Sequence, residues 1–114
     1  MASHRMARVS ELIRQQLNKL LIKELEWPKD CLITITRVKT TRDLSYTDVY
    51  ISIMPLDRQA EVMQLLENRR WKLQSILAKK ITIAMFPTIR FRLDDTEERA
   101  AHIESLIDSL NDKE

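Results

Sequence analysis

The first part of the chain carries apolar residues at the spacing of one helix face. They are Val9, Leu12, Ile13, Leu17, Leu20, Leu21 and Leu25, and this pattern predicts an amphipathic helix over about residues 5–26. The opposite face is mostly basic and carries Arg5, Arg8, Arg14, Lys19 and Lys23. Pro28 ends the helix, because proline disfavours helical backbone at the residue before it.

The pattern then changes to a period of two residues. Residues 32–38 are rich in β-branched side chains, which is typical of a strand. Residues 46–53 alternate between polar side chains and the apolar Val49, Ile51 and Ile53, and Pro55 stops this second strand. Only residues 41–45 separate the two strands, so we expect an antiparallel hairpin.

A second helical pattern follows and reaches about Lys80, with Asp57 as the expected N-cap. A straight helix of about 24 residues would be about 36 Å long, which is longer than the body it must pack on. The apolar stripe also lapses over residues 67–70. We therefore expect a kink or a short break there, which would give two helices in series.

The end of the chain combines one more strand and one more helix. Residues 88–93 alternate, with Ile89, Phe91 and Leu93 on one face and Arg90 and Arg92 on the other. Asp95, with Glu98 three residues later, resembles a capping box for a last helix over about residues 96–110. The order α-β-β-α-α-β-α predicts an α+β fold in which helices pack on one face of a three-stranded sheet.

Composition narrows the class of protein. The 114 residues fit one domain, and the absence of glycine excludes a Gly-rich phosphate loop, a dinucleotide fingerprint and a glycine-flanked serine elbow. No apolar run approaches the ~20 residues of a membrane span, and the first residues lack the apolar core of a signal peptide. The single cysteine, Cys31, cannot form an internal disulfide and suits the reducing cytoplasm.

The charge is divided unevenly along the chain. Residues 1–92 carry 17 Lys and Arg against 9 Asp and Glu, a balance of +8, whereas residues 93–114 carry 2 against 8, a balance of −6. A basic body suggests a polyanionic partner such as nucleic acid. The alternative is that these charges serve solubility and that the division arose by chance.

Five blocks of the sequence, followed by Asp94 and Thr96, match the pattern of one known family in their order and spacing: residues 5–13, 32–38, 41–52, 73–80 and 86–91. Together they resemble the ribosome-binding factor A family, which has a KH-like (type II) domain and acts in bacterial small-subunit assembly. The resemblance spans nearly the whole chain, so we expect residues 1–114 to form one such domain. The family normally has an Ala-x-Gly kink where this chain has Arg69-Arg70-Trp71, and this chain ends acidic where some relatives carry a basic extension.

The candidate RNA-binding residues form three groups. The first lies on the middle helical region, where arginine and lysine suit phosphate contacts and Trp71 is a candidate stacking surface for an unpaired base. The second is on the last strand, and the third is at the N-terminus and the hairpin turn. In each case the alternative is an ordinary solvated surface, with Trp71 in the core. The groups are Arg69, Arg70, Lys72, Lys79 and Lys80; Arg90 and Arg92, with Arg37 nearby; and Arg5, Arg8, Lys39 and Arg42.

The sequence offers no convincing catalytic or metal site. Asp94 and Asp95 form a carboxylate pair, but an adjacent helix start makes capping the better explanation than acid–base chemistry. Cys31, His4 and His102 lack metal-ligand spacing. We therefore expect no metal and no cofactor, and we read Cys31 as a small apolar residue.

The resemblance implies a non-catalytic assembly factor that binds the 30S subunit and 16S rRNA. It also implies that the factor assists late maturation and 5′-end processing of that RNA, often with importance in the cold. We expect a monomeric, cytoplasmic protein with no membrane partner and no small-molecule substrate. The alternatives are a protein-interaction module, dimeric through a sheet edge or the last helix, and a small nuclease.

Overall fold

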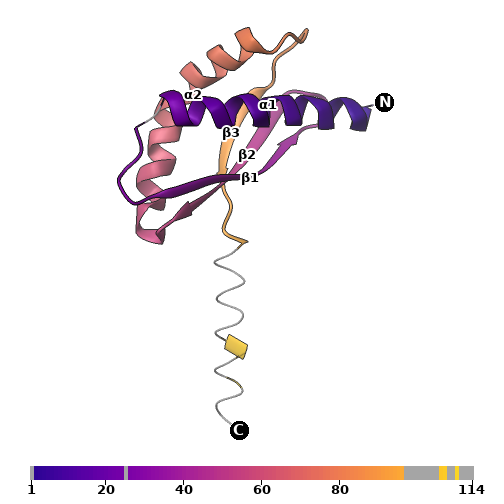
Figure 1. Cartoon of the computed structure of the whole chain (residues 1–114). Coiled ribbons are helices and arrows are strands. Elements are labelled where there is room, and N and C mark those ends of the chain that lie inside the picture. The colour runs from indigo at the N-terminus through magenta and orange to yellow at the C-terminus, as the bar shows by residue number, and fades with distance from the viewer. Residues whose placement is uncertain (1, 25, 97–105, 108–109, 111–114) are drawn as a thin grey trace.

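Two helices pack on one face of a three-stranded sheet (Figure 1). The computed structural model of the protein describes residues 2–24, 26–96, 106–107 and 110. Helix α1 packs on strand β1, helix α2 packs on strand β3, and the helices contact each other. The predicted α+β class is therefore confirmed. The elements are α1 (Ala2–Glu24), β1 (Leu32–Thr40), β2 (Tyr46–Met54), a short 3₁₀ helix η1 (Leu56–Arg58), α2 (Gln59–Lys80) and β3 (Thr88–Leu93).

The sheet has the order β1-β2-β3, with β1 and β2 antiparallel and β2 and β3 parallel. The predicted hairpin is confirmed, because Leu32 pairs with Met54 and Thr40 pairs with Thr47. A bulge between Ile35 and Arg37 shifts the register of β1. Beyond the bulge, Arg37 lies opposite Tyr50 and Lys39 lies opposite Asp48. Both basic residues therefore lie beside residues of β2 on the sheet face that the helices do not cover, which we call the uncovered face.

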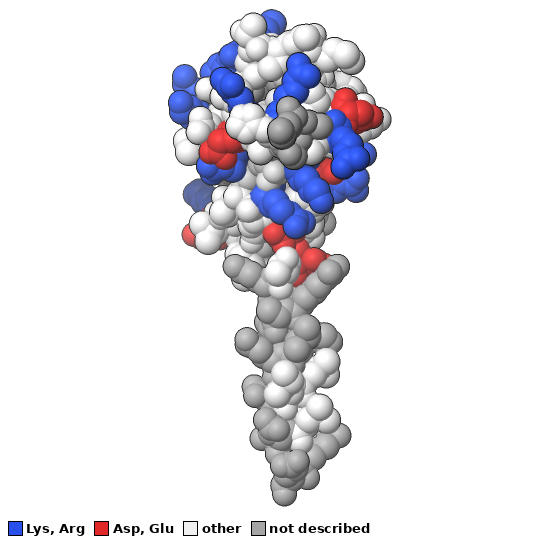
Figure 2. Space-filling view, turned by 90° about the vertical axis from the view of Figure 1, so that its right-hand side faces the viewer, with Lys and Arg blue, Asp and Glu red and all other residues white. Residues whose placement is uncertain are grey.

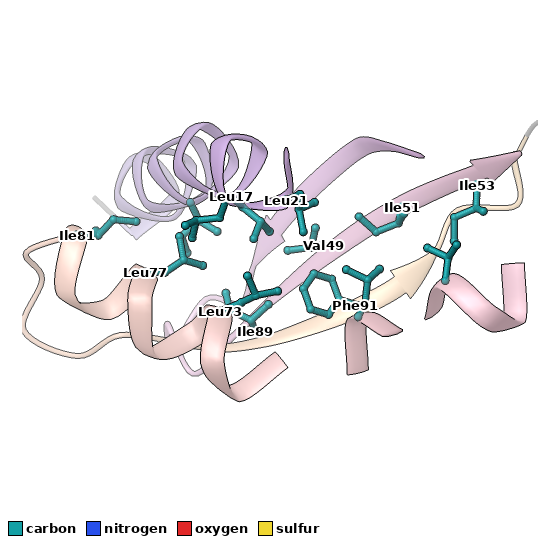
Figure 3. Close-up of a cluster of buried hydrophobic side chains, with 14 of the residues drawn as sticks. Leu17, Leu21, Val49, Ile51, Ile53, Leu73, Leu77, Ile81, Ile89 and Phe91 are labelled. Carbon is teal, nitrogen blue, oxygen red and sulfur yellow. The ribbon is translucent and has the colours of Figure 1, made fainter. Parts of the chain in front are cut away.

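The core lies between the helices and the sheet (Figure 3). Helix α1 contributes Ile13, Leu17 and Leu20, and the alternation predicted for β2 buries Val49, Ile51 and Ile53. Strand β3 adds Ile89 and Phe91, and α2 adds Val62, Leu66, Leu73 and Leu77. Because strands alternate, the side chains between these buried ones face away from the helices.

Buried hydroxyl groups connect α1 to the hairpin. Ser10 Oγ lies 2.7 Å from Thr40 Oγ1, which in turn lies 3.0 Å from Thr47 Oγ1. Both threonines are buried, so their hydroxyl groups rely on one another and on Ser10 for hydrogen bonds.

The predicted break into two helices in series is wrong, because residues 59–80 form one helix. The axis of α2 changes direction as it passes α1 (Figure 1), which fits the alternative prediction of a kink, and no residue leaves the helix. The lapse in the apolar stripe has a specific cause. Arg70 occupies the stripe between Leu66 and Leu73, its side chain is only 19% exposed, and its Nη1 donates to the carbonyl of Ile89 at 3.3 Å. The arginine stem thus takes the place of an apolar residue.

The prediction of Asp57 as an N-cap is also wrong. After Pro55 the chain first makes η1, so Asp57 lies inside that turn. Helix α2 begins one residue after Arg58, which caps it without a side-chain hydrogen bond. Most of the expected last helix, including Glu98, lies outside the described residues.

Candidate nucleic-acid interface

A groove runs between the middle of α2 and strand β3, with a volume of about 560 Å³. One wall comes from α2, because the unbroken helix presents Arg70 and Trp71 toward β3. The other wall comes from Arg90 and Arg92 of β3 and from Tyr46 at the start of β2. The groove therefore combines three guanidinium groups with two aromatic side chains that can stack, and its further lining residues are Glu67, Thr88 and Phe91.

Arginine side chains stack on both of these aromatic rings. The guanidinium carbon of Arg70 lies 4.5 Å from the ring centre of Trp71, and that of Arg90 lies 4.1 Å from the ring centre of Tyr46. Trp71 is 63% exposed, so the alternative that it belongs to the core is wrong. Exposed tryptophan beside fixed guanidinium groups is a surface on which an unpaired base can stack.

Asp48 holds the two arginines of β3 in place. Its Oδ1 accepts from Arg90 Nε at 2.7 Å and from Arg92 Nε at 3.5 Å, and its Oδ2 accepts from Arg90 Nη2 at 3.1 Å. Hydrogen bonding to Asp48 raises the pKa of Arg90 further above its usual value. The Asp48 side chain is only 15% exposed, whereas those of Arg90 and Arg92 are 35% and 52% exposed. One largely buried carboxylate therefore orients two arginine side chains that remain accessible to a ligand.

Arg70 is more tightly held than its neighbours. Its Nε donates to Glu67 Oε1 at 3.0 Å in addition to the bond to the Ile89 carbonyl. Arg69 and Lys72 are exposed on either side of the Arg70–Trp71 pair. Arg70 is therefore partly buried in the wall of the groove, whereas Arg69 and Lys72 lie at the surface.

The uncovered face of the sheet carries another arginine stacked on an aromatic ring, outside the groove. The guanidinium carbon of Arg37 lies 4.1 Å from the ring centre of Tyr50. Tyr50 is paired with Arg37 on one side and with Arg92 on the other. Lys39, which we grouped with the hairpin turn, is instead paired with Asp48.

A second basic surface lies at the end of the molecule that carries the N-terminus. Figure 2 shows Lys and Arg side chains gathered over this end. The start of α1, the β1–β2 turn and the loop after α2 meet here around a cleft of about 560 Å³. We call this surface the basic end; it comprises the exposed Arg5, Arg8, Arg42, Lys79 and Lys80.

The structure thus brings the predicted arginine and lysine residues together in different groups from those expected. The groove takes Arg70, Arg90 and Arg92 from two of the predicted groups, and the basic end combines Lys79 and Lys80 with residues of the third. Sequence reasoning missed Tyr46, Asp48 and Tyr50. The alternation that buries Val49 and Ile51 was the signal, since it places these three residues together on the opposite face.

Of the two adjacent carboxylates after β3, Asp94 has the geometry of a cap. Asp94 Oδ1 accepts from the backbone N–H of Thr96 at 3.0 Å, and Asp94 Oδ2 accepts from Thr36 Oγ1. The hydrogen bonds from Thr36 and Thr96 lower the pKa of Asp94 to about 2. A carboxyl group that stays ionised and hydrogen-bonded fits capping rather than proton transfer.

Among the described residues, no group of three or more His, Cys, Asp or Glu side chains is arranged to hold a metal ion. The helices of the described part of the chain are also too polar to span a membrane.

Comparisons with known proteins identify the family. The family model described as Ribosome-binding factor A matches residues 5–107. Ribosome-binding factor A of Alcanivorax borkumensis is 37% identical over 107 residues, covering 92% of this chain and 78% of that protein. The protein of the same name from Neisseria meningitidis serogroup C is 34% identical over 106 residues, covering 93% and 86%.

Solved structures agree in fold. The crystal structure of ribosome-binding factor A from Thermus thermophilus gives a TM-score of 0.58 at 20% identity, covering 82% of this chain and 94% of that one. A homology model of the Thermus thermophilus protein, fitted into a cryo-EM map of a 30S–RbfA complex, gives 0.58 at 20% identity, covering 79% and 91%. Together with the family match and the sequence relatives, this shows that the chain belongs to the ribosome-binding factor A family.

Proposed function

We propose that this protein is a non-catalytic factor that binds the 30S ribosomal subunit and 16S rRNA during late assembly. The observation that carries the proposal is the groove, in which exposed Trp71 lies beside Arg70, Arg90 and Arg92. Family membership and the fitting of a Thermus thermophilus relative into a 30S complex support the same partner. The proposal includes a single KH-like domain over residues 1–114 and action as a monomer in the cytoplasm, without a cofactor.

The two basic surfaces serve different parts of the RNA. The groove offers rings and guanidinium planes for an unpaired base, with arginine N–H groups for the adjacent phosphates. The basic end offers exposed charges that neutralise phosphates without reading sequence. The proposed contacts with RNA are Arg69, Arg70, Lys72, Arg90 and Arg92 at or beside the groove, Lys39 on the sheet face, and Arg5, Arg8, Arg42, Lys79 and Lys80 at the basic end.

Binding alone is sufficient for the proposed effect on maturation. A protein that prefers one conformation of the 16S rRNA 5′ region raises the population of that conformation by its differential affinity. Processing enzymes then meet the correct substrate more often. This effect grows where misfolded RNA escapes slowly, which is the basis for expecting a stronger requirement in the cold.

The test is complementation in cells that lack their own factor. We expect the double variant Trp71→Ala/Arg92→Gln to leave more immature 16S 5′ ends, measured by primer extension, and to bind 30S subunits more weakly. The matched control is Arg58→Gln, which removes an exposed arginine paired with Glu61 in η1, outside the groove. The proposal is wrong if the groove variant matures 5′ ends and binds 30S subunits as well as the control does.

A further inference from the structure

The uncovered face of the sheet has one residue from each strand aligned in a row across it. Arg37 of β1 is the cross-strand partner of Tyr50 of β2, and Tyr50 is in turn the partner of Arg92 of β3. We call these three residues the cross-strand row. The guanidinium carbon of Arg37 lies 4.1 Å from the ring centre of Tyr50. Neither Arg37 nor Tyr50 is among the described residues that line the groove, so this stacked pair is a separate feature.

The surroundings of the cross-strand row have a net positive charge. Two carboxylates lie near it, and both are engaged. Asp48 accepts hydrogen bonds from Arg90 and Arg92. Asp94 lies close enough to Arg37 for an electrostatic interaction, and it accepts from a threonine hydroxyl and from a backbone N–H. Three arginines against two carboxylates leave an excess of positive charge, and Arg37 and Arg92 are exposed.

The Arg37–Tyr50 pair presents a flat surface to the outside. Arg37 is exposed and Tyr50 is half-buried beneath it, so the outer plane of the guanidinium group remains free for a flat ligand. Unpaired bases stack on guanidinium planes as well as on aromatic rings. A pair that served only to hold the hairpin together would not require a further exposed arginine at the next strand, whereas a nucleotide brings a phosphate for Arg92 to bind.

The cross-strand row is continuous with the groove. Tyr46 lines the groove and lies on the same face of β2 as Tyr50, four residues earlier. Four residues of a strand span about 13 Å, which corresponds to about four nucleotides at the 3.4 Å repeat of a stacked strand. Arg90 and Arg92 line the groove and also pair with β2 residues of the uncovered face. The two sites are therefore joined by basic side chains within the reach of a short RNA strand.

We propose that the cross-strand row is a second base-stacking site, and that one single-stranded RNA segment passes from the groove across β3 onto the uncovered face. One unpaired base stacks at Trp71 in the groove. Another stacks on the guanidinium group of Arg37, backed by Tyr50, and Arg92 contacts a phosphate between the two. This inference rests on the proposed function and extends its RNA contact to the second face of the sheet. A requirement for unpaired bases at two places discriminates against duplex RNA.

The variant Arg37→Lys tests the stacking, because it keeps the positive charge and removes the planar group. The matched control is Arg58→Lys, which changes an exposed arginine paired with Glu61 outside both sites. We expect Arg37→Lys to bind a labelled single-stranded RNA of about ten nucleotides at least about 5-fold more weakly than the control does, as for one lost base stack. Both variants should bind a duplex RNA of the same length equally, because its bases are paired.

A contact with phosphate alone needs only the charge. Equal affinity of Arg37→Lys and Arg58→Lys for the single strand would therefore overturn the proposal. It would also be overturned if Arg37→Lys lost as much affinity for duplex RNA as for the single strand. Both affinities are measured by fluorescence anisotropy.

The ring of Tyr50 is tested with a second pair of variants. Tyr50→Phe keeps the ring and should bind the single strand like the unmodified protein, whereas Tyr50→Leu should lose about as much affinity as Arg37→Lys. Measurements are made well below the melting temperature of each variant, and equal affinities of the two would overturn the role of the ring. If Arg37→Lys binds normally while Trp71→Ala binds weakly, only this inference fails. If Trp71→Ala also binds normally, the groove and the proposed function fail as well.

Discussion

The two tryptophans of this chain should respond to mutation in opposite ways. Trp71 is 63% exposed at the groove. Trp27 is half-buried, packs against the core and donates its indole N–H to the Leu21 carbonyl at 3.1 Å. Replacing each by alanine separates a binding surface from a structural one within a single protein.

The size of each effect follows from the exposure. Truncation of a fully buried tryptophan costs about 3–5 kcal/mol, and only about a third of Trp71 is covered. We therefore expect Trp71→Ala to lower the free energy of unfolding by about 1 kcal/mol, or about 4 °C in Tm. A lost base stack costs about 1–3 kcal/mol, so RNA affinity should fall about 5- to 150-fold. Trp27→Ala should lose more stability and little affinity.

The assay combines urea unfolding, followed by circular dichroism, with fluorescence anisotropy of a labelled single-stranded RNA. A Trp27→Phe variant adds a direct reporter, because its only tryptophan emission comes from Trp71 and stacking should quench it. Unchanged RNA affinity in Trp71→Ala would refute the reasoning. A loss of stability above about 3 kcal/mol would refute the assignment of Trp71 as a surface residue.

Three further predictions concern stability. Thr40→Val should cost about 1–3 kcal/mol, because it leaves the buried Thr47 hydroxyl without its partner, whereas Thr40→Val/Thr47→Val should cost less; both are measured by urea unfolding. The pKa of Asp94 in the folded protein is lowered to about 2, so the stabilising effect of this carboxylate is present above pH ~4 and is lost as the pH falls from ~4 to ~2. Thermal melts should show this loss of stability in the unmodified protein and not in Asp94→Asn. Arg70→Gln should lower Tm more than Arg69→Gln, because only Arg70 bonds to the backbone of β3.

Each of these predictions has a contradicting result. The hydroxyl chain is unimportant if the double threonine variant is as unstable as Thr40→Val. The hydrogen bonds to Asp94 do not matter if the asparagine variant keeps the same acid dependence. Equal melting temperatures of Arg69→Gln and Arg70→Gln would contradict a structural role for Arg70.

Periodicity predicted most of the fold because burial here follows simple alternation. The spacing of Leu17, Leu20 and Leu21 placed α1, and the alternation around Ile89 and Phe91 placed β3 with its observed bounds. The break in α2 was predicted wrongly, because Arg70 holds a core position through a hydrogen bond to β3 that no local pattern reveals.

The candidate site was harder to predict than the fold. The sequence itself shows which residues are arginine and lysine. Which of them lie together depends on the parallel pairing of β2 with β3, which brings Tyr46 beside Thr88 and Asp48 beside Arg90. The bulge in β1 likewise sets Lys39 opposite Asp48 and not in the turn. Asp48 was overlooked because its role depends on the hydrogen bonds that it accepts from Arg90 and Arg92, and the sequence does not show these bonds.

The most direct test of the account is co-sedimentation with purified ribosomal subunits between about 50 and 300 mM salt, where phosphate-dominated binding falls steeply. We predict binding to the small subunit and not to the large one, with a salt dependence that becomes shallower when Arg5 and Arg8 of the basic end are changed to glutamine. The matched control changes Arg14 and Arg58, which are exposed and paired with neighbouring glutamates. No binding to the small subunit at any salt concentration would contradict the central claim, as would equal binding to both subunits.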